Sequence, residues 1–168
     1  TSVAEGFGMA FLEPWVAGRA VIARRLPGVT DDFEAAGLQL DSFYRSIPIP
    51  GDRPWLADCR RESALALEAA WASVPTAFRP QQSERQEEDS DAIDFARLTP
   101  ARQAEVLRRC ASNAAFESSV RSRSETLIDH LHRPPDHAVI DRNAAIVNDH
   151  YSVDFQRREL LKIYSQLL

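Results

Sequence analysis

The stretch that decides the fold runs Glu5-Gly6-Phe7-Gly8-Met9-Ala10-Phe11-Leu12-Glu13, near the start of a chain of 168 residues. Its two glycines predict a flexible turn, and the residues that follow predict a short helix that ends at Gly18. The apolar run Ala20-Val21-Ile22-Ala23 then predicts a short buried strand. A helix followed by a strand indicates an α/β unit, although one four-residue strand cannot form a sheet alone.

Glu5 and Glu13 place two carboxylates at the two ends of this stretch. Eight residues of helix rise about 12 Å, which is similar to the span between the two sugars of a nucleotide-sugar. Glycines let a backbone approach a ligand closely, and the N–H groups at the start of a helix favour a diphosphate. Carboxylates accept hydrogen bonds from sugar hydroxyls. The residue types therefore favour a sugar and phosphate site.

The whole string, with Ala17-Gly18 and Val21-Ile22-Ala23 after it, resembles the donor-site motif of retaining glycosyltransferases of the two-Rossmann-domain (GT-B) type. A second stretch, from His150-Tyr151-Ser152 through Arg158 and Tyr164 to Leu167-Leu168, resembles the terminal helix that closes chains of this family. The resemblance implies a helix-rich α/β fold: the C-terminal portion of a GT-B Rossmann-like nucleotide-sugar-binding domain with a helical extension.

The resemblance also implies a role for each residue of the motif. Glu5 matches the glutamate that lies against the donor hexose, and it is the candidate catalytic residue. Glu13 matches the glutamate that holds the ribose hydroxyls. The segment whose backbone amides face the sugar and its phosphates is matched by Gly6, Phe7, Gly8 and Met9. Such a site transfers the sugar with retention of configuration and stabilises the departing diphosphate by fixed dipoles, without a metal or other cofactor.

Part of the implied active site is missing from this chain. The arginine and lysine that grip the diphosphate in the family lie upstream of its motif, and no residue here matches them. We therefore expect an upstream N-terminal half or a partner chain to supply them together with the acceptor domain. The isolated chain is then inactive. A sugar phosphorylase of the same fold and a non-catalytic helical interaction module are the alternatives.

The composition excludes several other classes. The net charge is −5 and the pI is near 5.4, which argues against a broad nucleic-acid contact. No apolar run has the roughly 18–20 residues that a membrane span needs. Cys59 and Cys110 are too few for a disulfide framework, and neither belongs to a metal-spaced cluster. We expect a cytoplasmic protein.

The chain is expected to divide into residues 1–52, the end of the nucleotide-sugar-binding domain, and residues 53–168, the helical extension. An acidic loop is predicted at about 79–93, and an extended segment at Ile47–Gly51 because two prolines forbid a regular helix there. Capping residues and prolines mark the predicted helices: a small one from Thr30 to Gly37, Trp55–Val74, one from Thr99-Pro100 to about Leu131 with a break near Asn113, His137–Asp149, and Val153–Leu168 after Ser152.

Several side chains have a structural interpretation that competes with a functional one. An apolar stripe at helical spacing, formed by Phe7, Phe11 and Trp15, favours a core face over a base-stacking platform. Arg24 and Arg25 favour a surface ion pair over a phosphate contact. A surface role near a helix end, rather than a metal site, is favoured for His130, His132 and His137.

Overall fold

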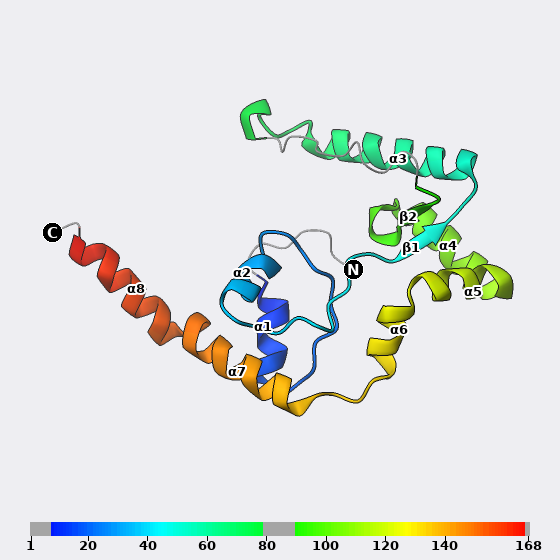
Figure 1. Ribbon diagram of the computed structural model, residues 1–168. Coiled ribbons are helices and arrows are strands. Elements are labelled where there is room, and N and C mark those ends of the chain that lie inside the picture. The colour runs from blue at the N-terminus through cyan, green and yellow to red at the C-terminus, as the bar shows by residue number, and fades with distance from the viewer. Residues whose placement is uncertain (1–7, 79–89, 167–168) are drawn as a thin grey trace. The chain divides into compact units, whose positions relative to one another are not determined.

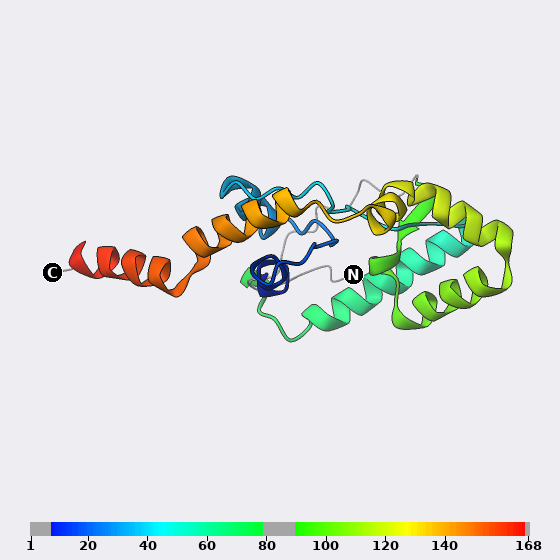
Figure 2. The ribbon, with the colours of Figure 1, turned by 90° about the horizontal axis from the view of Figure 1, so that it is seen from below.

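The computed structural model describes residues 8–78 and 90–166, which form many helices and one small sheet (Figure 1 and, seen from below, Figure 2). This confirms a helix-rich α/β chain at the coarse level. Within the described residues, no helix is long and apolar enough to cross a membrane. The elements in chain order are α1 (Met9–Val16), α2 (Thr30–Ala35), β1 (Pro48–Pro50), α3 (Arg53–Trp71), η1 (Thr76–Phe78), β2 (Ala92–Asp94), η2 (Phe95–Arg97), α4 (Pro100–Ser112), α5 (Ala114–Arg123), α6 (Glu125–His132), α7 (His137–Tyr151) and α8 (Val153–Gln166).

The chain folds into two compact units. One, which we call the discontinuous unit, combines residues 1–45 with 126–168, and the other, the inserted unit, contains 46–125. The sequence predicted a different division, at 52/53. The difference arises because α7 packs against α1 across the sequence, so the C-terminal helices do not all belong with the helices that precede them.

The core of the discontinuous unit is built around aromatic side chains of α1. Phe11, Leu12 and Trp15 are buried, which confirms the predicted core stripe for Phe11 and Trp15; Phe7 lies outside the described residues. The ring of Phe43 lies 5.6 Å from that of Phe11 and stacks at 6.0 Å on that of Trp15, between ring centroids. Such aromatic contacts add to the free energy gained by burial.

A buried amide joins α7 to the N-terminal segment. Asn143 is fully buried, and its Oδ1 accepts a hydrogen bond from the Gln39 N–H at 2.9 Å. Its Nδ2 donates to the Gln39 carbonyl, also at 2.9 Å. One side chain therefore satisfies both backbone groups of a residue 104 positions away.

The inserted unit contains the sheet. β1 and β2 pair antiparallel, with Ile49 opposite Ile93, and both side chains are buried. The extended segment Ile47–Gly51 is confirmed. The predicted loop at 79–93 is wrong at its end, because Ala92 and Ile93 form a strand that buries Ile93; positions 79–89 lie outside the described residues.

A charged network on α3 and α4 accompanies this sheet. The Arg102 guanidinium donates to Glu62 through Nη2 at 2.6 Å and through Nε at 3.0 Å, and Nη1 donates to Glu105 at 2.8 Å. The indole Nε1 of Trp55 donates to the same Glu105 carboxylate at 2.8 Å. These contacts fix α3 against α4 by charge-assisted hydrogen bonds.

The predicted strand Ala20–Ala23 does not form. Only one isolated parallel bridge, between Arg24 and Tyr44, lies beside it among the described residues. Val21 and Ala23 are half-buried against the core, as a strand interior would be, but a single bridge is too little for a ladder.

Most predicted helix ends are confirmed. Gly18 has φ +69° and its N–H donates to the Trp15 carbonyl, as expected after a helix C-terminus. Thr99 caps α4, Asn113 separates α4 from α5, and Ser152 caps α8, each accepting a hydrogen bond from a backbone N–H of the helix that follows.

Two of the helix predictions need correction. Thr30 is not a cap: it lies inside α2, and its buried hydroxyl donates to the Leu26 carbonyl at 2.8 Å. α3 begins at Arg53 rather than Trp55, because the Asp52 carboxylate accepts from the Trp55 N–H. Only Leu56 and Cys59 of α3 are buried.

Candidate functional site

Gly8 is the residue of the predicted motif that the structure defines most closely. It is buried, with φ +79° and ψ 22°, a left-handed conformation that favours glycine. A Cβ atom at this position would lie 2.7 Å from Val29 Cγ1 and 2.8 Å from Phe33 Cζ. Glycine is therefore required here for backbone conformation and for space.

The start of α1 is open. Gly8 is its N-cap residue and supplies no side-chain cap, and the first turn contains no acidic residue. The Phe11 N–H donates to the Gly8 carbonyl at 2.9 Å, whereas no described residue accepts from the N–H groups of Met9 or Ala10. Such N–H groups and the positive end of the helix dipole attract anions. The Met9 side chain is 47% exposed.

Glu13 lies one turn further along α1. Its side chain is exposed, and no described residue donates a hydrogen bond to its carboxylate. Five residues of helix separate it from Gly8, a rise of about 7.5 Å. Glu5, Gly6 and Phe7 lie outside the described residues, so the predicted pair of glutamates is represented here by Glu13 alone.

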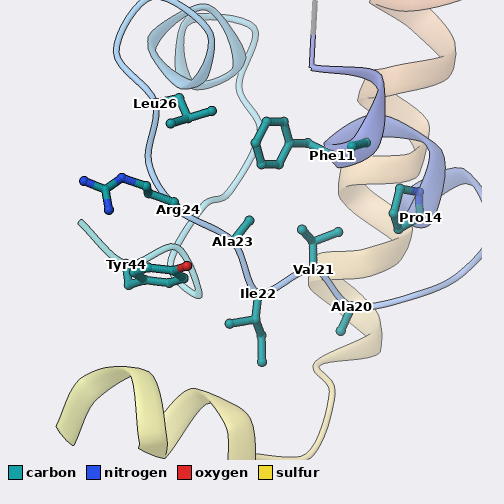
Figure 3. Close-up of a pocket in the computed structure, with 10 residues that line it drawn as sticks. Phe11, Pro14, Ala20, Val21, Ile22, Ala23, Arg24, Leu26 and Tyr44 are labelled. Carbon is teal, nitrogen blue, oxygen red and sulfur yellow. The ribbon is translucent and has the colours of Figure 1, made fainter. Parts of the chain in front are cut away.

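A hollow of about 390 Å³ lies beside another face of α1 (Figure 3). It is lined by Ala10, Phe11, Pro14, the residues from Ala20 to Arg24, Leu26 and Tyr44. Neither Met9 nor Glu13 belongs to this lining, so the hollow and the exposed motif residues occupy different faces of the helix.

Arg24 and Arg25, at the end of the extended segment beside the hollow, have different environments. Arg25 forms an ion pair with Glu34 at 2.6 Å, which confirms the surface interpretation for that residue. Arg24 lines the hollow. The guanidinium of Arg24 is the charged side chain among the lining residues, as Figure 3 shows.

Metal ligands and reactive thiols do not gather in the parts of the chain that the structure describes. No group of three or more His, Cys, Asp or Glu side chains there can hold a metal ion, His130, His132 and His137 included. Cys59 and Cys110 are free thiols, and burial raises the pKa of both. The expectation that no cofactor is needed stays a prediction.

The sequence did not indicate what surrounds Gly8. Val29 and Phe33 close the space around its α-carbon, yet they follow it by more than 20 positions and carry no local signal of that role. Phe33 also contacts the Phe11 ring edge-on at 5.9 Å between centroids. These two apolar side chains are therefore positioning residues for the start of α1.

No protein-family model, curated protein or solved structure matches the chain. The candidate site is therefore assigned from its geometry and from the motif alone.

Proposed function

We propose that this chain supplies the donor-binding segment of a retaining glycosyltransferase, which moves a sugar from a nucleotide-sugar to an acceptor. The observation that carries the proposal is Gly8. Its left-handed backbone and the lack of space for a Cβ require glycine at the N-cap, and glycine has no side chain that could cap the helix start. In this proposal the donor-binding segment belongs to the end of a GT-B Rossmann-like domain, and the reaction takes place in the cytoplasm.

The proposed roles combine the geometry of Met9, Ala10 and Glu13 with the resemblance of the motif. Backbone N–H groups of Met9 and Ala10 would bind a donor phosphate, because fixed amide dipoles stabilise negative charge without reorganising. The exposed carboxylate of Glu13 would accept hydrogen bonds from the ribose hydroxyls. Glu5, with Gly6 and Phe7, would contact the transferred sugar.

The proposal requires a second part of the active site. Positive groups for the diphosphate and a surface for the acceptor would come from an upstream half or a partner chain. We propose no metal for the site, since charge on the departing diphosphate would be stabilised by backbone dipoles and those positive groups.

The test is donor binding, by titration calorimetry, to the complete enzyme, which is this chain together with the upstream half or partner chain that the proposal requires, with UDP-, GDP- and ADP-linked sugars as probes. Glu13→Gln should weaken the binding of the preferred donor by about 1–3 kcal/mol, the range for a lost charged hydrogen bond. Glu68→Gln, an exposed glutamate of α3, is the matched control and should leave the affinity unchanged. Equal donor affinity of the Glu13→Gln variant and the unaltered chain would remove the proposed role.

A non-catalytic interaction module is the second candidate, and α8 favours it. No residue of α8 is buried, and it exposes apolar side chains at Leu160, Leu161, Ile163 and Tyr164. The same titration separates the candidates. A module binds none of the donors, and a sugar phosphorylase binds inorganic phosphate or a sugar phosphate in place of the nucleotide.

A further inference from the structure

We propose that the extended segment Ala20–Arg24 is a docking edge for a β-strand of a partner polypeptide, which lies parallel to it and extends a sheet. The inference is independent of the proposed glycosyl transfer, because it depends on backbone hydrogen bonds and on the hollow beside α1.

The backbone groups of Val21, Ala23 and Arg25 form hydrogen bonds on one edge of this segment. The Ala23 carbonyl accepts from the Tyr44 N–H at 2.9 Å, and the Arg25 N–H donates to the Tyr44 carbonyl at 2.7 Å. The Val21 carbonyl accepts from Ser42 Oγ at 2.6 Å. These groups belong to alternate residues, as in a β-strand that has one neighbour.

Ile22 belongs to the other edge. In an extended strand the N–H and C=O of one residue point the same way, and those of the next residue point oppositely. The backbone groups of Ile22 therefore point away from Ser42 and Tyr44. No described residue forms a hydrogen bond with the N–H or the C=O of Ile22. Such an edge is a template for pairing with another strand.

The hollow lies along this segment. Five consecutive residues, Ala20 to Arg24, line it. Successive side chains of a strand point to opposite faces, so an unbroken run of lining residues means that the backbone borders the hollow. Figure 3 shows the extended backbone passing between the Phe11 and Pro14 side of α1 and the segment that carries Tyr44.

The chemistry of the partner follows from the segment itself. Its one existing bridge, between Arg24 and Tyr44, is parallel. Ala20 to Ala23 carry apolar side chains that point to both faces, which is typical of strands inside parallel sheets. The occupant we infer is thus an apolar, β-branched strand that continues the parallel arrangement.

A second copy of this chain fits the edge poorly. Two copies related by a twofold axis would pair antiparallel, and a register centred on Ile22 would place Arg19 of one copy opposite Arg25 of the other. Like charges directly opposite each other destabilise a strand pair. The edge therefore favours a different polypeptide.

The test supplies a strand to the full chain. A segment Val-Thr-Val-Ile-Val-Thr is joined to Thr1 through a flexible Gly-Ser linker of about 20 residues, which is long enough for a parallel approach. Amide exchange at Ile22, followed by NMR, should slow at least about tenfold. The matched control carries the same linker and a strand with two prolines, which cannot donate the ladder hydrogen bonds.

The expected result is slow exchange at Ile22 with the strand and fast exchange with its proline control. The exchange of the Tyr44 N–H, on the edge that is already paired, should change less. Equal exchange at Ile22 in both fusions would overturn the proposal. Slow exchange of the Ile22 N–H in the unmodified chain would also overturn the proposal. If that chain sediments as a dimer, a second copy covers the edge; if it sediments as a monomer, the edge is covered by the chain itself. Donor titration is unaffected by these outcomes.

Discussion

The two compact units are stabilised by different chemistry. The discontinuous unit has an aromatic core and a neutral amide, Asn143, that satisfies the backbone of Gln39. The inserted unit has a short sheet and a network of charges around Arg102. The aromatic core of the discontinuous unit therefore depends on contacts between residues that lie far apart in the sequence. The main charged contacts of the inserted unit instead join two successive α-helices, α3 and α4.

The largest effect is expected from Asn143→Leu. The substitution leaves the part-buried N–H and C=O of Gln39 without their side-chain partner, and each unsatisfied group costs about 1–3 kcal/mol, so the discontinuous unit should lose about 3 kcal/mol. The inserted unit should change by less than about 0.5 kcal/mol. Hydrogen exchange resolved by segment measures the two units separately.

Asn148→Leu is the matched control for that variant, since Asn148 is an exposed asparagine of the same helix. It should leave both units near their original stability. If the two variants destabilise the discontinuous unit equally, the buried amide is not what joins α7 to the N-terminal segment.

An intermediate effect is expected from the helix caps. Asp136 accepts hydrogen bonds from the N–H groups of Ala138 and Val139 at 3.0 and 3.3 Å, whereas Thr99 accepts one from Arg102 at 3.4 Å. Asp136→Ala should destabilise the discontinuous unit by about 1 kcal/mol. Thr99→Ala should affect the inserted unit less, because its single bond is longer. Urea denaturation followed by segment-resolved exchange compares them, and a larger loss from Thr99→Ala would reverse this ranking.

The smallest effect is expected from pH, because the carboxylates involved are partly exposed. Hydrogen bonds from Arg102 hold the pKa of Glu62 and of Glu105 below the usual value. A lowered folded-state pKa gives stability that is present above the unfolded pKa and is lost as the pH falls through the folded one. The inserted unit should therefore weaken on acidification from about pH 5 to pH 3.

Arg102→Gln tests this pH dependence. The variant should be less stable than the unaltered chain at pH 7 and should lose less stability between pH 5 and pH 3, as measured by thermal unfolding at each pH. Asn143 does not titrate in this range, so its contribution to the discontinuous unit stays constant. An unchanged pH profile in the variant would show that the network does not cause the acid sensitivity.

Local signals predicted the helix ends well. Thr99 with Pro100, Asn113 and Ser152 each act on residues within one helical turn, so no distant contact is needed to interpret them. The predicted cap at Thr30 was wrong, because the Thr30 hydroxyl donates a hydrogen bond to the Leu26 carbonyl. The rule for helix caps does not include such an alternative partner for the side chain.

Long-range pairing was not predictable from this sequence. β1 and β2 join residues more than 40 positions apart, and β2 is only three residues long. Ala20–Ala23 has the composition of a strand but only one bridge beside it. At the candidate site, the sequence predicted a glycine turn at position 8. It did not predict that Val29 and Phe33 leave no room for a side chain there.

The distance in sequence between Gln39 and Asn143 has a consequence during synthesis. A ribosome adds about 5–20 residues per second, so roughly 5–20 seconds pass between the appearance of Gln39 and that of its partner 104 residues later. During this interval α1 has no α7 to cover Phe11, Leu12 and Trp15. Residues 46–125 can complete their own contacts first. The N-terminal segment is thus exposed to chaperones and to aggregation for longer than any later part of the same unit.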